Sequence, residues 1–123
     1  MGEEYVLVCM SDEKYVEFPA GKQMEILLNE FESKIVAGFL MINSLGNTGK
    51  YTFMDKTTFY EKGLNKKYYN ATADVLAYLF EEDCIDINKL SVFLAGWVYK
   101  IFEEAKMLNE LRELAQRKGK RRD

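Results

Sequence analysis

Histidine is absent from this sequence of 123 residues. Ser-His-Asp and Cys-His catalysis, zinc sites with histidine ligands and imidazole general bases all need that side chain, so each is excluded. Chemistry by carboxylates, lysine, tyrosine or cysteine stays open, but no spacing of residues selects it. We therefore expect no catalytic residue, no cofactor, no metal ligand and no small-molecule substrate, and predict that the protein is not an enzyme.

Cysteine and long apolar runs are scarce as well. The two cysteines, Cys9 and Cys84, lie far apart and provide neither a disulfide framework nor the spacing of a zinc site. No stretch approaches the roughly 18 consecutive apolar residues of a membrane span. The chain also does not start with a charged segment, an apolar run and a cleavage site, as a secretory signal does. These features predict a cytoplasmic protein that binds no membrane.

The chain does contain enough apolar material for one domain. Hydrophobic residues make up 48% and aromatic residues 14%, which suffices for a sizeable core. We expect a single α+β domain over residues 1–118 and a flexible basic tail over 119–123. The formal net charge of -3 is too small to indicate a DNA mimic or a generally basic nucleic-acid binder.

Local patterns in the first third predict a hairpin and a helix. Residues 5–10 and 15–18 are β-type runs on either side of a polar turn, so residues 1–18 are expected to form a β-hairpin. Residues 24–35 place apolar side chains at helical spacing and polar ones elsewhere. This segment is a good amphipathic helix.

Residues 35–42 allow two interpretations. They either continue that helix or form a buried strand paired with residues 50–54 through the turn at 45–49. Gly38 weakens a helix, and a glycine-asparagine turn before an aromatic, β-branched run is typical of a hairpin. We favour the strand.

The middle of the chain predicts one further helix. Residues 55–69 are expected to be irregular or briefly helical. Asn70 can then cap a helix over 71–82. Four residues of this helix share an apolar face: Ala71, Val75, Tyr78 and Leu79.

The last third predicts one long helix from about Asp86 to Lys118, capped by Asp86 or Asn88. Its first half is apolar nearly all round, which is typical of a helix buried by its own domain, so Trp97 should be buried. The expected fold is therefore α+β, with one or two β-hairpins packed against three helices, of which the last is long and amphipathic. The apolar residues of the first half are Leu90, Val92, Phe93, Leu94, Trp97, Val98, Tyr99, Ile101 and Phe102.

The second half of that helix carries a narrow apolar seam, which we define as Leu108, Leu111 and Ala115. A helix over 87–117 would be about 45 Å long at 1.5 Å per residue. A domain of this size is only about 35 Å across. The end with the seam is therefore expected to overhang and to need a partner, since isolated helices of this kind are marginally stable.

This seam leads to the functional prediction. We expect a non-enzymatic adaptor or stoichiometric inhibitor, by analogy with the accessory proteins of phages and mobile elements. Its partner is another protein or a second copy in a homodimer. The predicted partner-binding residues are Glu104, Leu108, Leu111, Arg112 and Ala115.

The alternative is a nucleic-acid-binding module. Interleaved cations and rings over residues 50–69 can hold phosphates and stack on bases, and the basic run 117–122 can add to them. The missing overall basic charge counts against this alternative. Its candidate contacts are Lys50, Lys56, Lys62, Lys66, Lys67, Tyr68 and Tyr69.

Two other segments only partly resemble known ligand motifs. Residues 42–52 lack the first glycine of a phosphate-binding loop and the Ser or Thr after its lysine, so we interpret them as a turn. Residues 81–88 lack the central glycine and terminal Glu of a calcium loop. We interpret this acidic run as a loop at a helix end.

Overall fold

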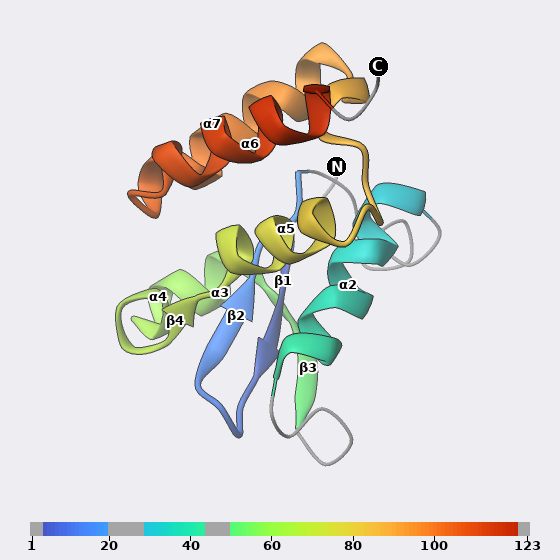
Figure 1. Ribbon diagram of the computed structural model, residues 1–123. Coiled ribbons are helices and arrows are strands. Elements are labelled where there is room, and N and C mark those ends of the chain that lie inside the picture. The colour runs from blue at the N-terminus through green and yellow to red at the C-terminus, as the bar shows by residue number, and fades with distance from the viewer. Residues whose placement is uncertain (1–3, 20–28, 44–49, 121–123) are drawn as a thin grey trace.

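The computed structural model describes residues 4–19, 29–43 and 50–120, with Lys120 described by its backbone alone. Its four-stranded sheet and six helices confirm the α+β fold class. Figure 1 shows the sheet at the bottom, α5 against it, and a pair of antiparallel helices, α6 and α7, on the far side of α5. The elements are β1 Tyr5–Cys9, β2 Lys14–Val16, α2 Glu30–Ile42, β3 Tyr51–Asp55, α3 Lys56–Glu61, α4 Leu64–Lys67, β4 Tyr69–Asn70, α5 Thr72–Glu81, a 3₁₀ turn Ile87–Lys89, α6 Val92–Glu104 and α7 Leu108–Lys120.

The sheet has the strand order β3-β1-β2-β4. Strands β1 and β2 form the predicted antiparallel hairpin, with Leu7 opposite Val16. Strand β3 pairs antiparallel with the other edge of β1, and the short β4 runs parallel to β2. The prediction of a strand over 50–54 is thus confirmed, although its partner is β1.

The central strand β1 is buried on both faces, which explains its continuous apolar sequence. Successive side chains of a strand point to opposite faces. Leu7 and Cys9 therefore join the main core beneath α2 and α5, while Val6 and Val8 pack with Phe59 of α3 in a second core. The two cores fix the helices on either side of the sheet.

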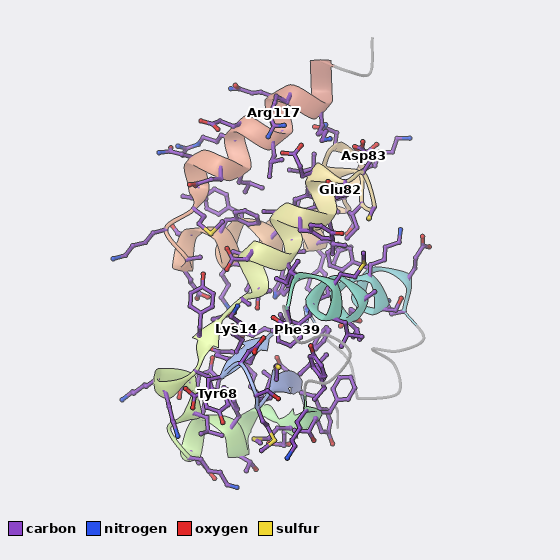
Figure 2. All side chains as sticks on the ribbon, turned by 60° about the horizontal axis from the view of Figure 1, so that its bottom comes forward. Lys14, Phe39, Tyr68, Glu82, Asp83 and Arg117 are labelled. Atoms are coloured by element: carbon purple, nitrogen blue, oxygen red, sulfur yellow. The ribbon has the colours of Figure 1, made fainter. Side chains whose placement is uncertain are left out.

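Residues 35–42 belong to α2, so the preference for a strand is wrong. Gly38 lies in the middle of this helix, and a Cβ there would lie only 3.0 Å from Val75 Cγ1 and 3.1 Å from Leu79 Cδ2 of α5. The glycine therefore allows two helices to approach closely and does not break one. Phe39 extends from α2 toward the sheet (Figure 2), where its ring meets Tyr51 edge-on. The predicted start of this helix, and the turn at 45–49, lie outside the described residues.

Helix α5 confirms the helix predicted over residues 71–82, but its N-cap is Ala71 and not Asn70. The Asn70 side chain accepts hydrogen bonds from the Thr72 amide, at 3.0 Å, and from the Thr72 hydroxyl, at 2.6 Å. Ala71, Val75 and Leu79 are buried, while Tyr78 is half-buried. The brief helices expected within 55–69 are α3 and α4.

The prediction of one continuous helix over 86–118 is wrong, because the chain forms a 3₁₀ turn and then a helical hairpin. Asp86 caps the 3₁₀ turn, and Ser91 caps α6 by accepting a hydrogen bond from the Leu94 amide. Helix α6 ends at Glu104 with Ala105 as its C-cap, and Lys106 adopts the left-handed conformation with φ 60°. Helix α7 continues through Lys120, although we expected the tail to begin at residue 119.

The turn between α6 and α7 is a Schellman motif. The amide of Lys106 donates to the Glu103 carbonyl and that of Met107 to the Phe102 carbonyl, at 3.0 and 2.8 Å. These bonds satisfy carbonyls at the end of α6 and reverse the chain. The expected overhang is therefore absent, because α7 folds back along α6 (Figure 1).

Candidate protein-binding surface

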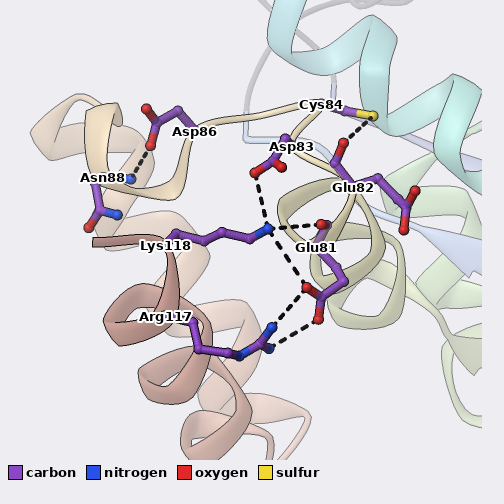
Figure 3. Close-up of polar contacts among 8 residues, drawn as sticks. All are labelled: Glu81, Glu82, Asp83, Cys84, Asp86, Asn88, Arg117 and Lys118. Carbon is purple, nitrogen blue, oxygen red and sulfur yellow. Dashed lines mark hydrogen bonds and ion pairs between the residues drawn. The ribbon is translucent and has the colours of Figure 1, made fainter. Parts of the chain in front are cut away.

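A cluster of charged residues ties the hairpin to α5 (Figure 3). Arg117 donates two hydrogen bonds to the Glu81 carboxylate, at 2.9 and 3.0 Å. Lys118 is 7% exposed, donates to the Glu81 main-chain carbonyl at 2.9 Å and lies 3.1 Å from Asp83 Oδ1. Its ammonium group thus sits at the carboxyl end of α5, where the helix dipole favours a cation.

This cluster also accounts for part of the basic run and the acidic loop noted in the sequence. The hydrogen bonds from Arg117 lower the pKa of Glu81 below its usual value, and those to Glu81 raise the pKa of Arg117. Two cations of the run and two acids of the loop are therefore bound to each other. Residues 121–123 of the tail lie outside the described part of the chain.

The seam on α7 faces the inside of the molecule. Leu108 and Leu111 are half-buried and pack against the main core, and Leu114 beside them is buried. Ala115 is half-buried as well. The premise that the seam has no partner within the chain is therefore wrong, since α5, α6 and the 3₁₀ turn supply one.

The two charged residues of the predicted site flank the hairpin turn without joining the seam. Glu104 and Arg112 are both exposed, one at the end of α6 and the other in the middle of α7. A partner approaching the hairpin can reach them, but it cannot reach most of the seam without displacing α7. Glu104 and Arg112 thus stay predicted contacts, while the seam has an internal role.

Within the described residues of the C-terminal hairpin, the exposed large apolar side chains lie on α6 instead, and we call their surface the α6 face. Val92 is 92% exposed, Phe93 63% and Tyr99 48%. Ala95 and Gly96 are exposed between them. At 3.6 residues per turn these five positions fall on one half of the helix. Contiguous exposed apolar patches often mark protein-binding surfaces.

The opposite side of α6 supplies the contact with the core. Val98, Ile101 and Phe102 are buried, and the Phe102 ring stacks on Phe80 of α5 with centroids 6.4 Å apart. Trp97 is half-buried and meets Phe31 edge-on. The prediction that α6 is buried nearly all round is therefore wrong: it has one buried face and one exposed apolar face.

Sequence reasoning missed this surface because the helix has more large apolar residues than one face can hide. A long helix in the middle of a domain can bury them all, whereas a helix in an outer hairpin cannot. The only available signal for this surface was Gly96. Glycine inside a helix is found where the helix is buried and closely packed, or where it crosses another helix.

The alternative nucleic-acid site is partly taken up by structural contacts. Lys56 lies 2.9 Å from Glu17 and 3.6 Å from Glu4. Burial alone would lower the pKa of Lys56, but the hydrogen bond and charge of Glu17, with Glu4 beyond it, raise it above its usual value. Glu17 also accepts from the Asn70 amide at 2.7 Å. This network holds α3 and β4 to the sheet, so Lys56 is not available for a phosphate.

The remaining candidates for nucleic-acid contacts divide between the surface and the core. Tyr68 packs against Phe59 in the second core. The Tyr69 hydroxyl donates a hydrogen bond to Asp74, and this bond raises the pKa of Tyr69 to about 12. Four lysines stay exposed: Lys50, Lys62, Lys66 and Lys67.

Comparison of the chain with known protein families, curated proteins and solved structures found no match. Among the described residues, no group of three or more Cys, Asp and Glu side chains is arranged to hold a metal ion. None of the described helices is long and apolar enough to cross a membrane. The geometry of this chain alone must therefore support any functional proposal.

Proposed function

We propose that this chain is a non-enzymatic protein-binding protein, an adaptor or stoichiometric inhibitor, that meets its partner through the C-terminal helical hairpin. The observation that supports this proposal is the exposure of Val92, Phe93 and Tyr99 on one helix face. Apolar side chains of this size are rarely left in water as a group. The contact surface therefore moves from the seam of α7 to the α6 face.

The energetics of burial favour this surface as the main contact. Covering a Phe or Val side chain fully contributes about 1.5–3 kcal/mol. Aromatic side chains near the centre of an interface usually supply most of its binding energy. Phe93 and Tyr99 are the aromatic anchors of the α6 face, and the exposed Glu103 and Glu104 form a polar rim at its end.

A photo-cross-linking experiment in the native host tests the proposal. The full chain carries p-benzoylphenylalanine at position 93, or at position 41 as a control, since Met41 is 68% exposed on α2. We expect ultraviolet light to join position 93, but not position 41, to a protein other than this chain, with or without nuclease. The adduct is identified by mass spectrometry. Equal labelling from both positions would contradict the proposal.

A nucleic-acid-binding module stays the second candidate because of one observation. Within the described residues, the exposed Lys62, Lys66 and Lys67 form no ion pair. Lys62 directly after α3, with Lys66 and Lys67 on α4, gives a small positive surface of the kind that contacts phosphates. Adducts from position 93 that disappear after nuclease treatment would favour this candidate.

A further inference from the structure

We propose that the α6 face of the isolated protein is covered by the same face of a second copy, with the two helices antiparallel and crossing at Gly96. This inference rests on the proposed function, because it takes the α6 face to be a protein-binding surface. It goes further by naming the occupant, the orientation and the point of contact.

Two of the three glycines within the described helices, Gly38 and Gly96, provide the first argument; the third, Gly119, lies in the last turn of α7. Gly38 of α2 lies against α5, where a Cβ would lie 3.0 Å from Val75. Around Gly96 of α6 the described residues leave open space, since none of them, apart from residues 95 and 97 and the helix's own backbone, has an atom within 4 Å of the position of a Cβ. Glycine destabilises an exposed helix interior relative to alanine. No positive φ explains Gly96 either, since Gly63 is the only described glycine with one.

A close crossing with another helix explains why residue 96 is a glycine, just as close packing against α5 explains why residue 38 is one. Gly96 lies near the middle of the exposed half of α6, between Val92 and Lys100 one turn away on each side. A second helix can therefore approach the backbone of α6 at this point and nowhere else on the exposed half without displacing a side chain. A two-fold axis through this point places Gly96 of both copies at the crossing, so each helix presents its gap to the other.

The antiparallel orientation follows from the positions on the α6 face. A two-fold axis at Gly96 brings residue 96−n of one copy level with residue 96+n of the other. Val92 of one copy then packs against Tyr99 and Lys100 of the second. Phe93 lies beside the aliphatic stem and ammonium group of Lys100, a favourable cation–π arrangement.

Charge at the two ends of α6 favours the same orientation. The amino-terminal end has the positive pole of the helix dipole and the exposed Lys89, whose ammonium group lies 4.0 Å from the Asp86 carboxylate. The carboxyl-terminal end has the exposed carboxylates of Glu103 and Glu104. Antiparallel helices place these ends beside each other with opposite charges, whereas parallel helices would place the four carboxylates together.

The size of the contact determines its strength. A helix of 13 residues is about 20 Å long, so one pair of helix faces buries less than the roughly 1,200–2,000 Å² of a standard interface. We therefore expect a dimer with micromolar or weaker affinity. Such a dimer protects the α6 face until a tighter-binding protein displaces the second copy.

Gly96→Ala separates the roles of this residue in the helix and in the dimer. Alanine is the better helix former and should raise the midpoint of thermal unfolding of the dilute monomer. The added methyl group should weaken the dimer several-fold in sedimentation equilibrium, because it fills the crossing point. Phe93→Glu should abolish the dimer, and the matched Met41→Glu on α2 should leave it unchanged.

Disulfide cross-linking tests the orientation in a Cys84→Ser background, where the remaining Cys9 is buried. In the antiparallel pair, residue 92 lies level with residue 100 of the other copy, within the 4.4–6.8 Å between Cα atoms that a disulfide allows. Two residues 92 would be about 12 Å apart along the axis. Val92→Cys with Lys100→Cys should therefore form a covalent dimer on oxidation, and Val92→Cys alone should not.

Three results would overturn the proposal: a wild-type monomer at all concentrations up to about 1 mM, which corresponds to a binding free energy weaker than about 4 kcal/mol; a dimer that survives Phe93→Glu; or a covalent dimer of Val92→Cys alone. These measurements use purified protein. A negative result for the dimer is therefore distinct from a negative result for the proposed function, which is tested by cross-linked adducts with another protein in the host.

Discussion

The two helices of the C-terminal hairpin contrast in composition and in exposure. Helix α6 is rich in large apolar residues, yet it exposes Val92, Phe93 and Tyr99. Helix α7 is mostly charged, yet it buries Leu114 and the stem of Lys118. The number of apolar residues in a helix therefore does not determine which of them are buried. Position in the fold does, since α7 has few apolar residues and turns all of them inward.

This contrast extends to the energetics of single side chains on α6. Phe102 is fully buried and Phe93 is 63% exposed, nine residues apart on the same helix. Phe102→Ala should lower the free energy of unfolding by about 3–5 kcal/mol, as for other core phenylalanines. Phe93→Ala should change it by less than about 1 kcal/mol, because the side chain has little to lose in the monomer. Urea unfolding of dilute protein measures both values.

Similar losses of unfolding free energy in Phe102→Ala and Phe93→Ala would contradict the contrast between the buried and the exposed face of α6. That result would mean that the α6 face is covered within the chain itself. A large loss at Phe93 that disappears on dilution would instead indicate coverage by a second copy, since the stability of a dimer depends on concentration.

The sequence predicted the elements that local chemistry determines. The hairpin of β1 and β2 has β-type runs on both sides of a polar turn. Helix α5 has both its apolar face and the Asn70 side chain at its start. These features are complete within about a dozen residues, so no distant contact was needed to recognise them.

Distant contacts determine the features that the sequence did not predict. Gly38 fits a helix only because α5 lies against it, and nothing near it in the sequence indicates this neighbour. Lys56 looked like a phosphate ligand, but Glu17, which directly follows β2 and is distant in the sequence, binds it. For the candidate surface, sequence reasoning selected the C-terminal region and missed the face, because the direction of the hairpin decides which side of α6 is exposed.

The hairpin turn itself was missed because its key position lacks the usual residue. Lys106 has φ 60°, a conformation for which helix ends normally use glycine. Lys106→Gly should therefore raise the free energy of unfolding by about 0.5–1 kcal/mol, since it relieves the strain of a side chain in the left-handed region. Lys100→Gly, in the exposed interior of α6, should lower it by about 1 kcal/mol.

Chemical denaturation of the two lysine variants therefore distinguishes a hairpin from a continuous helix. In a helix running from residue 86 to 118, both glycines would be interior and both would destabilise. Opposite signs are expected only if the chain turns at Lys106. Loss of stability in both variants would mean that α6 and α7 are one helix in solution.

The smallest expected effect concerns the cluster that holds α7 to α5. The hydrogen bonds from Arg117 lower the pKa of Glu81 in the folded protein below the ordinary value of 4.5. A carboxyl group with a lowered pKa stabilises the folded state above its unfolded pKa, and this contribution is lost as the pH falls through the folded pKa. Glu81→Gln should therefore reduce the free energy of unfolding at neutral pH and have progressively less effect below pH 4.5.

Urea titrations of the wild type and Glu81→Gln across the acid range measure this difference. Glu110→Gln is the matched control, because Glu110 lies exposed in the first turn of α7 and forms no ion pair within the described residues. Glu110→Gln should have the same free energy of unfolding as the wild type at neutral pH, because it removes no ion pair. A difference between wild type and Glu81→Gln that is the same at pH 3 and pH 7, or that grows with acid, would show that Glu81 does not bind Arg117 as a carboxylate. The Arg117 ion pair would then not contribute to holding the hairpin in place, whereas the contacts of Lys118 with the Glu81 carbonyl and Asp83, and the seam with Leu114, still would.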